Sequence, residues 1–308
     1  MMKDLYNDVK RTFESGTTLT RIIIVNIAVF VFVSILFVFT NFGVDAQTQG
    51  FYQQILHFIS INSDPSGLIL RFWANITYMF THTGFWHLLW NMLFLYWFGR
   101  IVGELIGDRH ILPLYILGGL AGAVMFVLGN QLVDYPGDLQ YCIGASASVM
   151  ALIVASGIIA PNYGMNLLLI GRVSLKYVVI VLVFLDIVGA SGRSNTGGHF
   201  AHIGGVLLGI LYIRQLRSGR DFSRWFDPIY ALFQKQYLRK TSTHKNMSLR
   251  YVNKRSSKKV SSEPKSGIHQ AKVDAILDKI KKVGYDKLTQ DEKDYLFLAA
   301  KEDRSNPD

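Results

Sequence analysis

The sequence predicts an all-α membrane protein in which six helices span the bilayer and both termini lie in the cytoplasm. Three observations lead to this prediction. Of the 308 residues, 50% are apolar and only 18% are charged, whereas a soluble domain carries about 25% charged residues. Several apolar runs are long enough to cross a hydrocarbon core of about 30 Å as helices. The basic residues are also unevenly distributed among the segments that join these runs.

The net charge is concentrated in the carboxyl-terminal part of the chain. From Arg214 onward there are 22 basic and 12 acidic residues, which accounts for the whole formal charge of +10. Because the rest of the chain is neutral and apolar, we expect this basic tail to bind anionic lipid head groups of the bilayer and not nucleic acid. Cys142 is the single cysteine, so neither an internal disulfide nor a cysteine-rich metal site is expected.

The first expected span covers residues 21–40 and contains no charge after Arg21. Its apolar core is too long for a cleaved secretory signal, so we expect it to stay in the membrane. Five further runs of suitable length follow, and their residue ranges are 85–105, 111–131, 143–160, 174–191 and 199–217. The fifth run is the weakest of these, because the carboxylate of Asp186 lies inside it.

The basic residues support this number of spans. If the connecting segments alternate between the two sides, one side holds the basic tail together with Lys3, Lys10, Arg11, Arg21, Arg100, Arg109, Arg172 and Lys176. The other side holds only Arg71 and Arg193. Since positive charge accumulates on the cytoplasmic side of a membrane protein, both termini are predicted to be cytoplasmic.

The distribution of apolar and charged residues divides the chain into five parts. They are a cytoplasmic segment at 1–20, the membrane domain at 21–217, an interfacial amphipathic segment at 218–240, a basic disordered linker at 241–268 and a small helical hairpin at 269–303. Within the hairpin, the spacing of Thr289 and Glu292 matches a capping box that opens a second helix.

Four polar side chains of the expected spans lie at a similar depth. His87 and Asn91 are one helical turn apart near the outer end of the second span. Ser146 lies near the outer end of the fourth span and His202 near that of the sixth. Polar groups inside a span are costly, so residues that three spans bring to one level are candidates for a functional site.

Taken one at a time, these residues also have structural explanations. A membrane serine commonly bonds its own helix backbone, and His87 and Asn91 can form an interhelical pair. Small residues such as Gly144, Gly205 and Gly209 permit close helix packing. Asp186 can act as a local cap or form a local ion pair, with Arg193 as an available partner.

A serine beside a histidine, with no carboxylate in an obvious third place, indicates a nucleophile–base dyad. The imidazole takes the hydroxyl proton during attack and passes it to the leaving amine. A second histidine and an asparagine nearby offer hydrogen-bond donors to the oxyanion that forms. A site close to the outer surface also gives water access, which hydrolysis requires.

Three motifs over residues 70–212 resemble those of the rhomboid family of intramembrane serine proteases. HLLWN at 87–91 is similar to the family's HxxxN motif, and GASAS at 144–148 is similar to its GxSG-type nucleophile segment. AHIGG at 201–205, followed by Gly209, resembles its AHxGG segment. The order of the three motifs and the spans that carry them also agree with the family.

The resemblance implies the roles of the site residues. Ser146 would be the nucleophile and His202 the general base, with His87, Asn91 and the backbone N–H of Ser146 lining the oxyanion hole. Gly144, Gly205 and Gly209 would support this arrangement. The substrates implied are transmembrane proteins, cut within or beside a membrane helix, and no cofactor or metal is implied.

The sequence departs from the family pattern at three places. Ala147 stands where a glycine is more common, and Met150 where many members have an aromatic ring against the catalytic histidine. A Trp-Arg pair common in the first loop is replaced by Trp73 and Ala74. His199 is a rival for the role of base, but the motif favours His202.

Two other functions remain open from the sequence. One is a catalytically silent rhomboid-like protein that binds membrane clients, although both the serine and the histidine are present. The other is a six-span transporter, which would place its polar groups near the midplane and show internal repeats. From the sequence, we expect a multi-pass integral protein of a bacterial inner membrane.

Overall fold

The structure is a computed structural model that describes residues 2–41, 46–132, 139–167, 171–190 and 196–231, together with scattered residues between 273 and 295. The chain divides into two compact units, Met1–His244 and Lys245–Asp308. The predicted linker at 241–268 lies outside the described residues.

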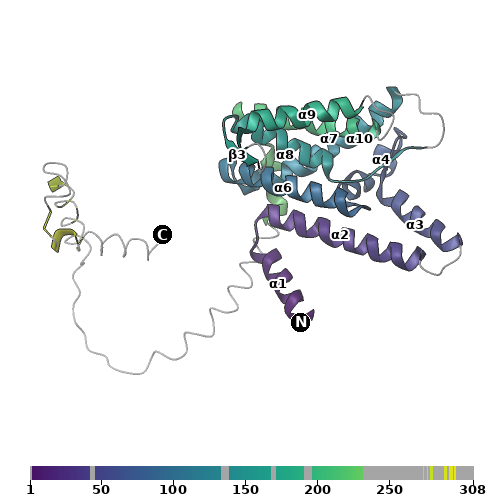
Figure 1. Cartoon of the computed structure of the whole chain (residues 1–308), viewed down its shortest axis with the longest axis horizontal. Coiled ribbons are helices and arrows are strands. Elements are labelled where there is room, and N and C mark those ends of the chain that lie inside the picture. Colours follow the sequence, from purple (N-terminus) through teal and green to yellow (C-terminus); the bar gives the residue numbers. More distant parts are fainter. Residues whose placement is uncertain are drawn as a thin grey trace. The chain divides into compact units, whose positions relative to one another are not determined.

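The first unit is mostly helical, and its ribbon is shown in Figure 1. Its first part comprises α1 (Met2–Ser15), α2 (Thr18–Asn41), α3 (Ala46–Ile59), β1 (Ile61–Asn62), α4 (Gly67–Leu70), α5 (Ala74–Thr77), the 3-10 helix η1 (Tyr78–Phe80) and α6 (Phe85–Ile106). The remainder comprises η2 (Asp108–His110), α7 (Ile111–Leu132), β2 (Tyr141–Cys142), α8 (Ser146–Ile159), β3 (Gly164–Leu167), β4 (Gly171–Ser174), α9 (Leu175–Ala190), α10 (Thr196–Arg217) and η3 (Phe222–Phe226).

Within the described residues there are two short antiparallel ladders, which the all-α prediction did not include. β1 pairs with β2 so that Ile61 lies opposite Cys142, which ties the first long loop to the residues just before α8. β3 pairs with β4 in the connection between α8 and α9, with Gly164 opposite Ser174. The second ladder is not predictable from the sequence, because each of its strands is only four residues long, which is too short for a periodicity to be recognised.

Helices lie within all six segments that the sequence predicts as spans. Two of them are long and apolar enough to cross a membrane by length and composition, namely the segments Thr18–Thr40 and Asp108–Leu132. α8 is apolar but shorter. α6 and α10 are each 22 residues long, but their polar side chains lower the mean hydropathy. The six-span arrangement therefore stays a prediction.

α10 packs closely against α8 as well as against α7. A Cβ atom added to Gly205 on α10 would overlap the backbone oxygen of Ala147 on α8. One turn later, a Cβ atom at Gly209 would lie 2.7 Å from the backbone oxygen of Ala151. Without a hydrophobic driving force between helices in lipid, such close backbone approach supplies the van der Waals contact that holds helices together.

α9 packs less tightly than its neighbours. Of the α9 residues whose burial the structure describes, Leu175 alone is buried. The helix exposes a long row of apolar side chains, among them Ile180, Phe184 and Val188. An outward apolar face of this kind suits contact with lipid.

The first residues of the predicted interfacial segment at 218–240 fold back against the start of α7. Asp221 caps η3, and the guanidinium of Arg109 donates to Ser223 Oγ at 2.9 Å. Phe226 is buried, whereas Trp225 is 66% exposed. The segment therefore anchors to the helices through one aromatic side chain and presents the other outward, which suits an interface. Residues 232–240 lie outside the described part.

The second unit contains the predicted capping box. The backbone N–H of Thr289 donates to Glu292 Oε2 at 2.8 Å, and the N–H of Glu292 donates to Thr289 Oγ1 at 3.4 Å. This reciprocal pair confirms the prediction made from the spacing of the two residues. Lys279 Nζ also donates to Glu292, and its ammonium holds the pKa of that carboxyl below its usual range.

The close approach at Gly205 yields a stability prediction. Gly205→Ala is expected to lower the free energy of unfolding by about 1–3 kcal/mol, because the added methyl group must push α10 away from α8. SDS titration of the detergent-solubilised protein measures the change. Gly50→Ala on α3 is the matched control, since a Cβ atom there meets nothing within 4 Å. Equal stability of the two variants would contradict the close packing.

Candidate active site

Ser146 is the first residue of α8 and follows a sharp turn. Ala145 and Ala147 on either side of it are buried, while Ser146 itself is partly accessible. The first backbone N–H groups of a helix have no partner within that helix, so the N–H of Ser146 faces outward from the helix end. Ser146 therefore presents a hydroxyl and a backbone donor at the same point.

The turn before Ser146 is fixed by Gly144 and its neighbours. Gly144 has a φ of 122°, which a residue with a side chain rarely adopts. Its N–H donates to the backbone oxygen of Tyr78 at 2.9 Å. A Cβ atom at Gly144 would lie 2.6 Å from Cε1 of His87. Both the conformation and the space at this position thus require glycine.

His82 is a supporting residue that the sequence analysis missed. Its side chain is fully buried, and its Nε2 accepts a hydrogen bond of 3.3 Å from the backbone N–H of Ala145. Its ring also lies edge-on to that of His87, with centroids 5.0 Å apart. The residue was detectable in principle, because it is a histidine just before the predicted second span. His82 fixes the backbone directly before the nucleophile candidate.

The structure brings Ser146 and His202 together. His202 lies on α10, and its Nε2 is 2.6 Å from Ser146 Oγ. The His202 side chain is 19% exposed. At this distance the imidazole can accept the hydroxyl proton directly. His199, the rival base, bonds instead to Asp186 through its Nδ1.

A carboxylate lies on the other side of the His202 ring. Asp186 Oδ1 on α9 is 2.5 Å from His202 Nδ1 and 2.7 Å from His199 Nδ1. The sequence shows no carboxylate in an obvious third place, but the structure brings Asp186 to this place from α9. Because it contacts two histidines of α10, Asp186 is more than a local cap. Arg193, the partner first considered for it, lies outside the described residues.

The depth comparison that grouped the other site residues applies to Asp186 as well. It lies about one turn from the outer end of the predicted span at 174–191, and His202 lies at a similar depth in the next span. Depth therefore places Asp186 at the level of the site, but depth alone does not show that its side chain points toward His202.

His87 and Asn91 lie on the same side of α6, but their relation to Ser146 differs. The ring of His87 lies against Gly144, two residues before Ser146. Asn91 is buried and donates from Nδ2 to the backbone oxygen of His87 at 2.8 Å. One amide donor of Asn91 is thus bonded within its own helix, and the second N–H of the amide is the one available to a ligand.

One group of described residues has the spacing of a metal site. Donor atoms of Asp186, His199 and His202 all lie within 4.8 Å of one another. The two hydrogen bonds to Asp186 Oδ1 account for this cluster without an ion. Asp186 Oδ1 lies 2.5 Å from Nδ1 of His202 and 2.7 Å from Nδ1 of His199. These are distances between hydrogen-bonded atoms.

The residues that replace the family's Trp-Arg pair still connect parts of the first loop. Trp73 Nε1 donates to the backbone oxygen of Phe58 at 2.9 Å, and the two rings stack with centroids 5.0 Å apart. Arg71 donates to the backbone oxygen of His57. Ala74 is buried. The loop that precedes α6 is therefore anchored to the end of α3.

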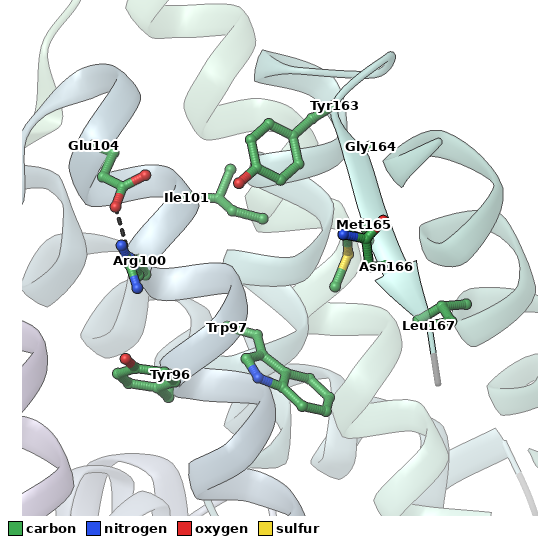
Figure 2. Close-up of a pocket in the computed structure, with 10 residues that line it drawn as sticks. All are labelled: Tyr96, Trp97, Arg100, Ile101, Glu104, Tyr163, Gly164, Met165, Asn166 and Leu167. Carbon is green, nitrogen blue, oxygen red and sulfur yellow. Dashed lines mark hydrogen bonds and ion pairs between the residues drawn. The ribbon is translucent and has the colours of Figure 1, made fainter. Parts of the chain in front are cut away.

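A separate open hollow of about 450 Å³ lies between the second half of α6 and β3, as Figure 2 shows. Arg100 and Glu104 form an ion pair of 2.6 Å on its wall. Tyr96 and Trp97 on α6 and Tyr163 on the facing side contribute aromatic surface. The hollow lies toward the end of α6 away from His87, so it is not part of the site around Ser146.

The contact of His82 yields a prediction about the turn before Ser146. His82→Leu is expected to lower the free energy of unfolding by about 1–3 kcal/mol, because the buried N–H of Ala145 loses its acceptor. His82→Gln is the control, since its amide oxygen can take the place of Nε2. SDS titration of both variants measures the effect, and equal losses would show that the acceptor does not matter.

The comparisons with known proteins agree with the site. Residues 70–218 match the family model described as "Rhomboid domain". Residues 265–299 match a family of unknown function, DUF6576, and this match covers most of the predicted hairpin.

Three curated relatives illustrate the similarity. The chain is 28% identical over 198 residues to "RHOMBOID-like protein 12, mitochondrial" of Arabidopsis thaliana, covering 59% of this chain and 58% of the relative. It is 31% identical over 137 residues to "Presenilin-associated rhomboid-like protein A, mitochondrial" of Danio rerio, covering 44% and 35%. It is 32% identical over 152 residues to "Rhomboid-related protein 1" of Caenorhabditis elegans, covering 46% and 38%.

The chain thus spans between 35% and 58% of the length of these relatives. The matched region contains α6 to α10 and every residue of the site described above. Residues 70–218 thus form a domain of the rhomboid family, whose members are typically intramembrane serine proteases.

Proposed function

We propose that this chain is an intramembrane serine endopeptidase that hydrolyses peptide bonds in or beside the transmembrane helices of other proteins. The observation that carries the proposal is the 2.6 Å contact between Ser146 Oγ and His202 Nε2. The two residues come from different helices, and neither atom would approach the other without the close packing of α8 and α10. Each also belongs to a motif of the rhomboid family.

The proposed topology has six spans and cytoplasmic termini. Helices α2, α6, α7, α8, α9 and α10 would be the spans, with the basic tail against the anionic cytoplasmic leaflet. Ser146, His202 and His87 lie at the starts of their helices, on the end that this topology directs outward. Water would then reach the site from one side of the membrane.

The proposed reaction begins with attack of Ser146 Oγ on the carbonyl carbon of the scissile bond. As the C–O bond forms, the hydroxyl proton moves to Nε2 of His202. The imidazolium then gives this proton to the leaving amine as the C–N bond breaks, which leaves an acyl-enzyme. A water molecule attacks the acyl carbon, His202 takes its proton, and Ser146 is regenerated with release of the acid.

The oxyanion of each tetrahedral intermediate requires hydrogen-bond donors. The proposal assigns this role to the backbone N–H of Ser146, the ring of His87 and the side-chain amide of Asn91. Each such donor contributes about 3 kcal/mol to the transition state in a site that excludes bulk water. One N–H of the Asn91 amide donates to the backbone oxygen of His87, so the second N–H is the one assigned to the oxyanion.

The substrate class follows from the position of the site. A peptide bond can react only when its carbonyl is accessible, so a helical substrate must unwind locally at the cut. We therefore propose substrates whose membrane helices contain helix-weakening residues near the outward face. Entry from the bilayer would require a transient displacement of a peripheral helix before the chemical step, and α9 is the loosely packed one.

The comparisons support one part of the location that the sequence predicts, namely the membrane. As a rhomboid it is an integral membrane protein. The relatives include proteins described as mitochondrial, so they give no support to the bacterial inner membrane expected from the sequence. The alternative of a catalytically silent rhomboid-like protein that binds clients remains, and the experiment below separates it from the protease.

Replacement of the nucleophile tests the proposed activity. Ser146→Ala is expected to abolish both cleavage of a reporter transmembrane segment and labelling by a serine-directed fluorophosphonate, because it removes the attacking oxygen. His202→Ala is expected to do the same through loss of the base. Gel assays in detergent and in proteoliposomes measure both effects.

Ser148→Ala is the matched control for this experiment. Ser148 is on the same helix and fully buried, and its Oγ contacts Met79 Sδ at 3.8 Å. The control variant should retain both cleavage and labelling. Wild-type protein that is folded but neither labels nor cleaves would favour the silent client-binding protein.

Cysteine labelling tests the proposed topology in a variant that lacks Cys142. Ser66→Cys is expected to react with a membrane-impermeant maleimide added outside, because this exposed residue precedes α4 in the outer loop. Ser218→Cys, which follows α10 and is also exposed, should react only after the membrane is opened. Labelling of both from the same side would rule out six spans.

A further inference from the structure

We propose that Asp186 is a positioning residue that completes a Ser146–His202–Asp186 arrangement in place of a simple serine–histidine dyad. This inference rests on the proposed protease function. It adds a member that the three sequence motifs do not contain, from α9, a helix that carries none of these motifs.

The environment of Asp186 demands a specific partner. Its side chain is only 9% exposed and lies on α9 within a predicted span. A carboxylate inside a membrane domain is expensive unless it is paired and hydrogen-bonded. The two imidazole rings that meet its Oδ1 supply that pairing. A carboxylate that faced lipid without a partner would leave the cost of its burial uncompensated.

The contact with His202 selects one tautomer of the ring. Nδ1 of His202 lies 2.5 Å from a carboxylate oxygen that can only accept, so in the neutral ring the proton belongs on Nδ1. The lone pair on Nε2 is then free to accept the hydroxyl proton of Ser146 at 2.6 Å. Without the carboxylate, the neutral ring could instead carry its proton on Nε2. A protonated Nε2 has no free lone pair, so it cannot take the proton of Ser146.

The same contact stabilises the charge that forms during the reaction. When the proton of Ser146 reaches Nε2, the ring becomes an imidazolium with its Nδ1–H still bonded to Asp186. The carboxylate stays ionised and forms an ion pair with the ring until Nε2 passes its proton to the leaving amine. No further reactant is needed, and the proton balance of the dyad mechanism is unchanged.

His199 shares the carboxylate and offers a purely structural alternative. Its Nδ1 also bonds Asp186 Oδ1, and its ring lies against Gly189 on α9. Asp186 could therefore serve only to hold α9 against α10. That role would depend on His199 as much as on His202, whereas the positioning role depends on the bond to His202. The two roles predict different kinetics.

The test is a kinetic comparison of full-length variants in proteoliposomes with a reporter segment. Asp186→Asn is expected to lower kcat by at least about 10²-fold with little change in KM, because the amide can donate to Nδ1 and so favours the wrong tautomer. Glu104→Gln is the matched control, since that carboxylate forms an exposed pair with Arg100, and its kcat should stay within about twofold of wild type.

Two further variants separate the outcomes. His199→Ala should lower kcat far less than Asp186→Asn. Equal losses in both, with equally lowered thermal midpoints, would overturn the positioning role in favour of a helix tether. A kcat of Asp186→Asn close to wild type would also overturn it. If Ser146→Ala kept its activity, the proposed protease mechanism itself would fall, which is a distinguishable result.

A measurement on the wild-type protein covers the case in which Asp186→Asn does not fold. Nitrogen NMR of protein labelled only in histidine reports which ring nitrogen carries the proton, and His202→Ala identifies the signal. The inference predicts that neutral His202 is protonated on Nδ1, with a proton shifted far downfield by the carboxylate. Neutral His202 protonated on Nε2 would overturn it.

Discussion

The hydrogen bond between Ser146 and His202 depends on the distance at which α8 and α10 pack. At Gly205 the backbone of α10 lies so close to Ala147 that no side chain fits between them. A wider spacing would separate the hydroxyl from the imidazole by the same amount. In a membrane domain, small residues are the means by which helices approach closely, so the residues that stabilise this part of the fold are also those that assemble the proposed dyad.

The polar side chains that create the site make the helices that carry them less suited to lipid. α6 carries His87 and Asn91, and α10 carries His199 and His202, and neither helix is among the two that are apolar enough to span by composition. Asp186 on α9 extends the same pattern to a third helix, because its cost is offset by the two imidazole rings.

Sequence reasoning located most of this arrangement because depth in a membrane can be counted along a helix. The helical segments and the common depth of Ser146 and His202 follow from residue spacing, whereas the pairing of these two residues is what the rhomboid motifs imply. The supporting role of His82 was not predicted, because this residue lies in a loop and no periodicity predicts the path of a loop. The place of Asp186 also escaped, since depth fixes the level of a residue but not the direction in which it points around its helix. Met150 lies where the rhomboid resemblance leads us to expect an aromatic ring beside the histidine. The proposed bond from Asp186 is another way to orient the imidazole of His202.

The central claim is that the hydroxyl of Ser146 is activated for nucleophilic attack. Its most direct test is mass spectrometry of the wild-type protein after reaction with a fluorophosphonate, followed by digestion and fragment sequencing. The account predicts a single phosphonate adduct on Ser146, formed only by folded protein. An adduct on another serine, or cleavage of a reporter segment by a protein that forms no adduct, would contradict it.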